Sequence, residues 1–391
     1  MCCLAASSIG LCTNAIGVFY TPVSKSLHVL KGTFAIHATL STLITALTSL
    51  KMSKLIRKYN YKKILLIGVL LSSVSTWMMS YSRSVYLFYI LGILRGIGVG
   101  IGGMVPITVI ITNWFDEKHG LATSLALSFS GLAGAIFSPL LSSWIISYGW
   151  QMTYRLMASC ILILVLPVLI VPWKINPQEE GMLPYGYQEK KDTIKIQNKK
   201  VNLITISFIC MCIFTLLHTS ITGISQHLSG IALSIHLSAT SGAILMSLTM
   251  IGNISTKLLI GFLSDLLNPI KAVIIMILAN CFSLGLLFLG VIHQEIMLLY
   301  IGSFMFGSIY SVGAVGIPML THYFFGNENY ARTYSFIGFL TNVGSASSLI
   351  GYLYDFTQSY QMVFIIALCF HLINLILLVV ICLRYNGVGD K

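Results

Sequence analysis

The sequence predicts an all-α polytopic membrane protein with about twelve transmembrane helices in two pseudo-symmetric six-helix halves. Of its 391 residues, 56% are hydrophobic and only 9% are charged, whereas soluble domains carry about 25% charged residues. The charges gather in short stretches such as 51–63 and 190–200, and the nearly uncharged intervals between them run for about 20 residues, enough to span lipid as a helix. Because backbone groups in lipid must pair within the protein, continuous apolar runs favour helices over a barrel.

Each apolar run predicts one helix, with ends uncertain by a few residues. The first run begins at Met1 without a basic leader, so it indicates a helix and not a cleaved signal peptide. The predicted helices are 1–22, 33–50, 64–82, 84–112, 121–147, 152–173, 202–224, 238–262, 271–292, 294–320, 331–353 and 361–383.

The distribution of Lys and Arg predicts the topology. An even number of helices places both termini on one side, and the loops on that side hold most of the basic residues. The loops on the other side hold only Lys25, Lys31, Arg83 and Arg155. We therefore expect a multi-pass protein of the cell membrane with both termini in the cytoplasm. The one long polar stretch, 174–200, is then a cytoplasmic linker between an N-terminal half (1–173) and a C-terminal half (201–391).

Composition also weighs against several function classes. The net charge of +12 is carried beside apolar runs and not by a soluble basic domain, so we expect no nucleic-acid partner. The nine cysteines form no CxxC pair and indicate small buried apolar residues, without a metal or cofactor. No HExxH, Walker or partnered GxSxG pattern is present, which argues against an enzyme or an ATP-driven pump. A sensor would normally carry a larger soluble domain than 174–200.

The two halves resemble each other weakly, as expected for a transporter built from repeats. A shift of 208 positions superimposes Leu55, Asn60 and Lys63 on Leu263, Asn268 and Lys271. Shifts of 209 and 210 bring further residues into register, among them Thr112 with Thr321 and Gln151 with Gln361.

This arrangement resembles the major facilitator superfamily, which carries a Gly-x-x-x-Asp-Arg-x-Gly-Arg motif after its second helix. The first copy here is degenerate, since Ser53, Arg57 and Asn60 stand where the family has Gly, Asp and Gly. The second copy keeps Gly261 and Asp265 but lacks the following basic pair. The resemblance implies that Arg57, Gly261 and Asp265 belong to the cytoplasmic gate, with the family's charge relay rebuilt from different partners.

Within that superfamily the chain is most similar to the branch of oxalate/formate antiporters and monocarboxylate porters. The segments that carry this similarity are Gly17-Val18-Phe19-Tyr20, Arg95-Gly96-Ile97-Gly98, Asn113-Trp114-Phe115, Gly120-Leu121-Ala122, Ser130-Gly131-Leu132, Ser138-Pro139, Gly149-Trp150 and Gly351-Tyr352-Leu353-Tyr354-Asp355. The resemblance implies a secondary transporter of a small organic anion that works by alternating access. Its partners are then the anion and the lipid bilayer, and we expect a monomer.

Lys257 is a candidate substrate ligand because a charge within a transmembrane run is costly and therefore indicates function. By its spacing before Gly261 and Asp265, it stands where related carboxylate carriers have an eighth-helix Arg that pairs with the substrate. A Lys at that place offers a point charge and not a bidentate fork. Alternatively, Lys257 lies near the helix end and extends to the cytoplasmic headgroups.

Arg95 is the second cation within an apolar run, about eleven residues into the fourth predicted helix and followed by several glycines. It either contacts the substrate or bonds backbone carbonyls of neighbouring helices to fix the bundle.

Three uncharged polar residues complete the predicted substrate site. Asn14 stands where eukaryotic monocarboxylate porters have a Lys, and Asn342 is the most polar central residue of an eleventh helix that lacks the Lys of oxalate carriers. Tyr20 either lines the cavity as an amphipathic donor or packs in the bundle.

The acidic residues all lie in loops or near helix ends, Asp265 and Asp355 being closest to membrane depth. Only His218 and His371 could titrate readily within the helices, and each is alternatively a packed neutral histidine. His218 is the candidate proton carrier. The lack of a buried carboxylate favours exchange or facilitated diffusion. A proton-coupled symporter, an efflux carrier of another small solute and a non-transporting sensor are the alternatives.

Overall fold

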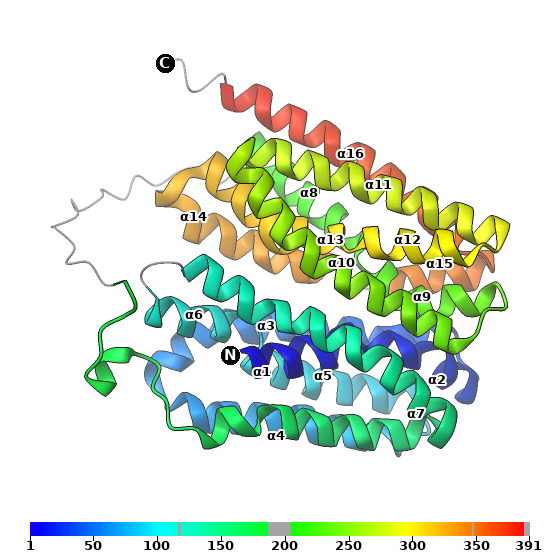
Figure 1. The fold of residues 1–391 in the computed structure, drawn as a ribbon. Helices are drawn as coiled ribbons and strands as arrows, with labels where there is room; N and C mark the ends of the chain where they lie inside the picture. Colours follow the sequence, from blue (N-terminus) through cyan, green and yellow to red (C-terminus); the bar gives the residue numbers. More distant parts are fainter. Residues whose placement is uncertain (116–118, 187–204, 346–347, 387–391) are drawn as a thin grey trace. The chain divides into compact units, whose positions relative to one another are not determined.

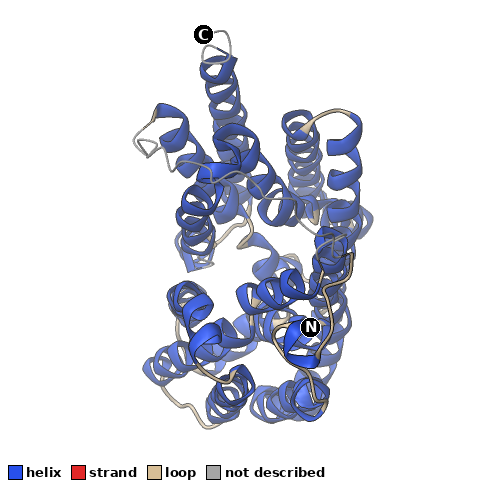
Figure 2. Ribbon diagram, turned by 90° about the vertical axis from the view of Figure 1, so that its left-hand side faces the viewer, coloured by secondary structure: helices blue, strands red, loops and turns tan. Residues whose placement is uncertain are grey.

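The computed structural model describes residues 1–115, 119–186, 205–345 and 348–386, which form helices joined by short loops (Figures 1 and 2). The described residues contain no strand, only one isolated bridge between Phe115 and Tyr185. The all-α fold class is thereby confirmed. The chain divides into two compact units, Met1–Ile194 and Lys195–Lys391. Residues 187–200 of the predicted linker lie outside the described residues.

The first unit begins with an irregular helix and continues with long regular ones (Figure 1). Its elements are α1 (Cys2–Leu4), a π-helix η1 (Ala5–Asn14), a 3-10 helix η2 (Ile16–Phe19), α2 (Tyr20–Ser26), α3 (Lys31–Lys58), α4 (Tyr61–Met79), α5 (Val85–Gly102), α6 (Met104–Trp114), α7 (His119–Ile170) and a 3-10 turn η3 (Pro177–Glu180).

The second unit repeats this plan of long helices with one irregular segment. Its elements are α8 (Ile206–Ile221), α9 (Ile224–Ser234), α10 (Ala239–Leu266), α11 (Pro269–His293), α12 (Ile296–Phe306), α13 (Ser308–Ser311), a π-helix η4 (Val312–Gly316), α14 (Ile317–Gly344), α15 (Ser348–Thr357) and α16 (Gln361–Asn386).

Eleven helical segments of the described chain are long and apolar enough to cross a membrane. One of them, Leu125–Ile170, has 46 residues and would be about 69 Å long at 1.5 Å per residue, more than twice the hydrocarbon thickness. Gly149 interrupts it with φ 80°, a conformation that favours glycine. This segment therefore corresponds to two predicted helices, 121–147 and 152–173. Counted as two, it brings the eleven segments of the described chain to the twelve predicted crossings.

Side-chain caps fix several helix starts. The Asn60 side chain accepts a hydrogen bond from the backbone N–H of Lys62 at the start of α4, and Asn268 accepts one from Lys271 at the start of α11. Pro269 occupies the first turn of α11, where its missing N–H costs nothing. These equivalent caps belong to the residue pairs that related the two halves in the sequence.

The structure corrects the boundary between the predicted helices 294–320 and 331–353. The segment 321–330 lies between these two predicted helices, but α14 continues through it from Ile317 to Gly344. The segment contains no proline, so nothing in it prevents helical hydrogen bonding. The break falls instead at Ser345, inside the predicted eleventh helix, where the backbone leaves the helical conformation.

Glycines bring α5 into direct contact with α3 on both sides of Arg95. A Cβ at Gly92 would overlap the carbonyl oxygen of His37, and one at Gly96 would overlap that of Ser41. The Thr45 hydroxyl donates to the Gly96 carbonyl across the same interface. Arg95 therefore projects from a helix whose backbone is held firmly against its neighbour.

Candidate functional site

Lys257 lies in the second half of α10, nine residues before the last helical residue Leu266. The helix extends four residues beyond its predicted end, which moves Lys257 further from the helix terminus than the sequence suggested. The side chain is half-buried. It forms no hydrogen bond or ion pair with any described residue.

Asn253 precedes Lys257 by one helical turn and lies on the same face of α10. It is buried, and its Oδ1 has no hydrogen-bond partner among the described residues. The backbone around it is tightly packed, because a Cβ at Gly252 would overlap the carbonyl oxygen of Phe304 and one at Gly307 would overlap the backbone of Asn253. An unpaired acceptor and an unpaired cation thus lie one turn apart on a rigid helix.

Arg95 is buried inside the first unit, with 1% of its surface exposed. Its Nε and Nη1 have no hydrogen-bond partner among the described residues. Its charge acts electrostatically on Cys12 of η1, His37 of α3 and Tyr154 of α7. Nε and Nη1 therefore form none of the bonds to backbone carbonyls that the bundle-fixing alternative requires.

Asn14 and Tyr20 occupy the irregular first helix of the same unit. Asn14 ends the π-helix η1, which is closed by a hydrogen bond from the Ala15 amide to the Gly10 carbonyl (3.1 Å), and its Nδ2 donates to the carbonyl of Ser130 in α7 (3.1 Å). Such π segments are frequent at functional sites. Tyr20 is buried, with its ring in edge contact with His37.

Asn342 lies in the last turn of α14, half-buried, and its Nδ2 donates to the Gly338 carbonyl one turn earlier (2.9 Å). This local bond leaves its Oδ1 available as an acceptor.

The predicted gate residues lie at the ends of α3 and α10. Asp265 is exposed in the last turn of α10 and forms no ion pair with any described residue. Gly261 has open space where a Cβ would be, so no close helix contact requires a glycine there. Arg57 belongs to α3, but its side chain lies outside the described part of the chain.

His218 in α8 and His371 in α16 lie together in the interior of the second unit, with ring centroids 5.8 Å apart. His218 Nε2 donates to the Ile309 carbonyl (3.0 Å), and His371 Nε2 donates to Asn280 Oδ1 (2.7 Å). The Asn280 amide in turn donates to the Phe306 carbonyl and the Ser308 hydroxyl. Both Nδ1 atoms are buried without a partner among the described residues. The pair can therefore hold α12 and α13 in place while leaving two basic nitrogens free.

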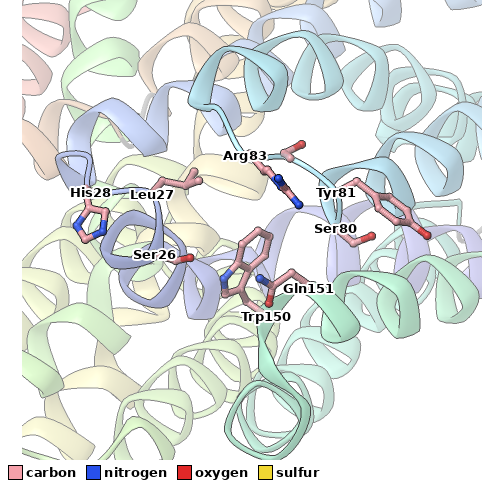
Figure 3. Close-up of a pocket in the computed structure, with 9 residues that line it drawn as sticks. Ser26, Leu27, His28, Ser80, Tyr81, Arg83, Trp150 and Gln151 are labelled. Atoms are coloured by element: carbon pink, nitrogen blue, oxygen red, sulfur yellow. The ribbon is translucent and has the colours of Figure 1, made fainter.

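A cavity of about 480 Å³ opens at one end of the first unit. In Figure 3 the Arg83 side chain points toward Trp150 and Gln151. The lining residues come from the α2–α3 connection, the α4–α5 connection and the start of the helix after Gly149, and they are Ser26, Leu27, His28, Ser80, Tyr81, Ser82, Arg83, Trp150 and Gln151. The lining of this cavity is polar and includes the basic residues His28 and Arg83. The cavity lies at the helix ends that the topology prediction assigns to the outer side.

Several polar residues of these clusters were not among the predicted site residues. Asn253 could have been found from its spacing of four before Lys257. His37, Tyr154 and Asn280 gave no such signal, because the contacts that give them importance come from helices distant in the sequence. Among the described residues, no three His, Cys, Asp or Glu side chains lie close enough together to bind a metal ion.

Comparison with known sequences gives consistent results. The sequence profile of the Major Facilitator Superfamily matches residues 2–348 and, in an overlapping match, 203–387. The uncharacterized MFS-type transporter YcxA of Bacillus subtilis (strain 168) is 24% identical over 43% of this chain and 41% of its own length. YhjX of Escherichia coli (strain K12), also an uncharacterized MFS-type transporter, is 23% identical over 77% of this chain and 73% of its own. Monocarboxylate transporter 12-B of Danio rerio is 27% identical over 46% of this chain and 39% of its own.

Solved structures of transporters share the fold. The nucleoside transporter NupG aligns with a TM-score of 0.71 at 10% identity, over 98% of this chain and 97% of its own. A D-xylose-proton symporter aligns with a TM-score of 0.71 at 14% identity, over 96% of both chains. At these identities the likeness concerns the fold and not the solute.

Proposed function

Because the chain belongs to the Major Facilitator Superfamily, whose members are membrane transporters and not enzymes, we propose that it carries a small organic anion of the monocarboxylate class by alternating access. The observation that carries this proposal is Lys257, a cation within a membrane-spanning helix that has no partner among the described residues. An unpaired charge in a bilayer is costly. When a substrate binds, its carboxylate pairs with the Lys257 ammonium group and removes this cost, which favours binding.

The neighbouring groups suit a ligand that carries a carboxylate and a further polar group. Asn253 Oδ1 is an acceptor one turn from Lys257, so a hydroxyl or a protonated group of the substrate could donate to it. Asn14, Tyr20 and Asn342 are the uncharged polar residues that we propose as further substrate ligands. Two relatives support an anionic cargo by name, the monocarboxylate transporter 12-B of Danio rerio and the benzoate transport protein of Acinetobacter baylyi.

Exchange of one anion for another, or facilitated diffusion, is the mode that we favour. Carrying a proton together with an anion requires a titratable group in the transport path, and the acidic residues lie outside the apolar runs or at their ends. The gate on the cytoplasmic side is then formed by the regions of Arg57, Gly261 and Asp265, with both termini and the linker in the cytoplasm.

Proton-coupled transport is the second candidate, favoured by one observation. His218 and His371 each keep a buried Nδ1 without a partner among the described residues, and these two nitrogens could take up a proton. In that case His218 is the proton carrier.

A thermal-shift panel on the purified protein tests the anionic cargo. A ligand that binds only the folded state stabilises it by about 2.7 kcal/mol at a concentration 100 times its Kd. We expect formate, acetate, lactate or benzoate to raise the melting temperature in a saturable way. The matched neutral amides formamide, acetamide, lactamide and benzamide should not. Equal stabilisation by the amides, or stabilisation by nucleosides or xylose alone, would contradict an anionic cargo.

A further inference from the structure

Arg95 carries a guanidinium group that is buried in the first unit. Leaving a charge buried without a counter-charge is strongly unfavourable. Arg95 is 1% exposed, so bulk solvent does not reach the charge, and Nε and Nη1 have no hydrogen-bond partner among the described residues.

No salt bridge to Arg95 is formed by the acidic residues that the structure describes in the first unit, Glu179 and Glu180. The acidic residues between Met1 and Ile194 are Asp116, Glu117, Glu179, Glu180, Glu189 and Asp192, and all of them lie outside the apolar runs. Since no acidic residue of this unit belongs to the apolar runs that surround Arg95, a bound anion is a suitable source of the counter-charge.

Tyr154 supplies a further donor in the same interior. Its ring stacks on Phe19 with centroids 4.0 Å apart and contacts Phe88 at 6.0 Å. Its hydroxyl is fully buried and has no partner among the described residues. Because Phe88 precedes Arg95 by two turns of α5, this ring contact places Tyr154 against the helix that carries Arg95. Three buried donor atoms of this unit, two from Arg95 and one from Tyr154, thus have no hydrogen-bond partner among the described residues.

His37 closes the cluster from α3 without being an anion ligand itself. Its Nδ1 donates to the Phe34 carbonyl (2.6 Å), so the neutral ring offers Nε2 as an acceptor, and that Nε2 is buried and unpaired among the described residues. The ring packs against Phe34 and Phe88 with centroid distances of 4.4 and 5.8 Å. A water molecule or a hydroxyl group accompanying the ligand would satisfy Nε2.

We propose that Arg95 and the Tyr154 hydroxyl bind a small monovalent anion in the interior of the first unit. The aromatic rings of Phe19, Phe34 and Phe88 surround this cluster with apolar surface, which favours an ion that is easily desolvated. Chloride and the carboxylate group of an organic acid share this chemistry. The site stands on residues of the first unit alone, so it does not depend on Lys257 or on the solute transported.

Thermal-shift titration of the purified full-length protein tests the site, starting from a chloride-free buffer with sodium sulfate at matched ionic strength. Sodium chloride or sodium formate should raise the melting temperature saturably in the wild type. Tyr154→Phe, which keeps the ring, should weaken this binding about tenfold, the usual effect of losing one hydrogen bond to a charged ligand. Arg95→Gln should abolish it.

Two variants serve as matched controls. Arg155→Gln removes an arginine that already donates to the Ser80 hydroxyl and lies over the Tyr81 ring. Tyr86→Phe removes the hydroxyl of an exposed tyrosine. Both should keep the wild-type response.

The chloride and formate titrations distinguish an inorganic ion from an organic carboxylate at this site. A chloride response that persists in Lys257→Gln identifies an inorganic ion, whereas a response to formate alone that also persists in Lys257→Gln identifies a carboxylate at Arg95. If Arg95→Gln fails to fold, the weaker anion response of Tyr154→Phe tests the site instead. A search for anomalous scattering from bromide beside Arg95 in wild-type crystals gives a second test. The site is rejected if no anion stabilises the wild type, if Tyr154→Phe responds like the wild type, or if the response disappears in Lys257→Gln.

Discussion

Replacing Lys257 by Gln should weaken binding of the anionic substrate about 10- to 150-fold. The ammonium group has no partner among the described residues, so its interaction with the substrate carboxylate replaces no internal bond. A hydrogen bond to a charged group contributes about 1.5–3 kcal/mol, and each 1.4 kcal/mol is a factor of ten in Kd. Lys257→Arg keeps a cationic donor and should retain binding within about tenfold of the wild type. Gln keeps much of the length of the side chain, so packing along α10 changes little.

Isothermal titration of the purified variants with the best carboxylate of the thermal-shift panel measures this loss. Lys271→Gln is the matched control, because Lys271 is an exposed lysine whose backbone N–H, and not its side chain, bonds to the Asn268 cap. It should bind like the wild type. Wild-type affinity in Lys257→Gln would refute the assignment of Lys257 as the carboxylate partner.

Three further predictions concern topology, coupling and stability. A phosphatase fusion at Gln188 should be inactive and a cytoplasmic reporter fused there active, since the Lys and Arg excess assigns the linker to the cytoplasm; phosphatase activity would reverse the orientation. An imposed pH gradient alone should drive little accumulation in vesicles, and robust uphill uptake that is lost in His218→Ala would instead establish His218 as the proton carrier. Asn280→Leu should lower the melting temperature, because it leaves His371 Nε2–H and the Phe306 carbonyl unpaired in the interior, at about 1–3 kcal/mol for each unsatisfied group; Ser255→Ala on the exposed face of α10 should not, and an unchanged melting temperature in Asn280→Leu would show that water replaces these bonds.

Helix number and approximate position could be predicted from the sequence because apolar runs report directly on the length that crosses a bilayer. The points at which one helix ends and the next begins could not be predicted in the same way. The polar segment 321–330 resembles a loop in hydropathy, yet it continues α14, since polar residues without proline are compatible with a helix. The π-helix η1 was likewise not predicted, because hydropathy does not distinguish π from α hydrogen bonding; Gly10 within it packs so closely on α7 that a Cβ would overlap Ala133.

The candidate site was predictable only in its charged members. Lys257 and Arg95 are conspicuous because charges are rare in apolar runs. Their surroundings depend on tertiary packing, which joins Arg95 with His37, 58 positions earlier, and Tyr154, 59 positions later (95 − 37 and 154 − 95). Periodicity within one helix contains no information about such pairs, with the exception of Asn253, which shares a helix face with Lys257.

Counterflow in reconstituted vesicles is the most direct test of anion transport by this protein. Vesicles preloaded with an unlabelled monocarboxylate should take up the labelled compound transiently above equilibrium, without a pH gradient or ATP. Lys257→Gln vesicles should show little of this uptake, and vesicles preloaded with the matched neutral amide should show none. Uptake that is no faster than in protein-free vesicles across the carboxylate panel, or counterflow of the neutral amide at the same rate, would contradict anion transport.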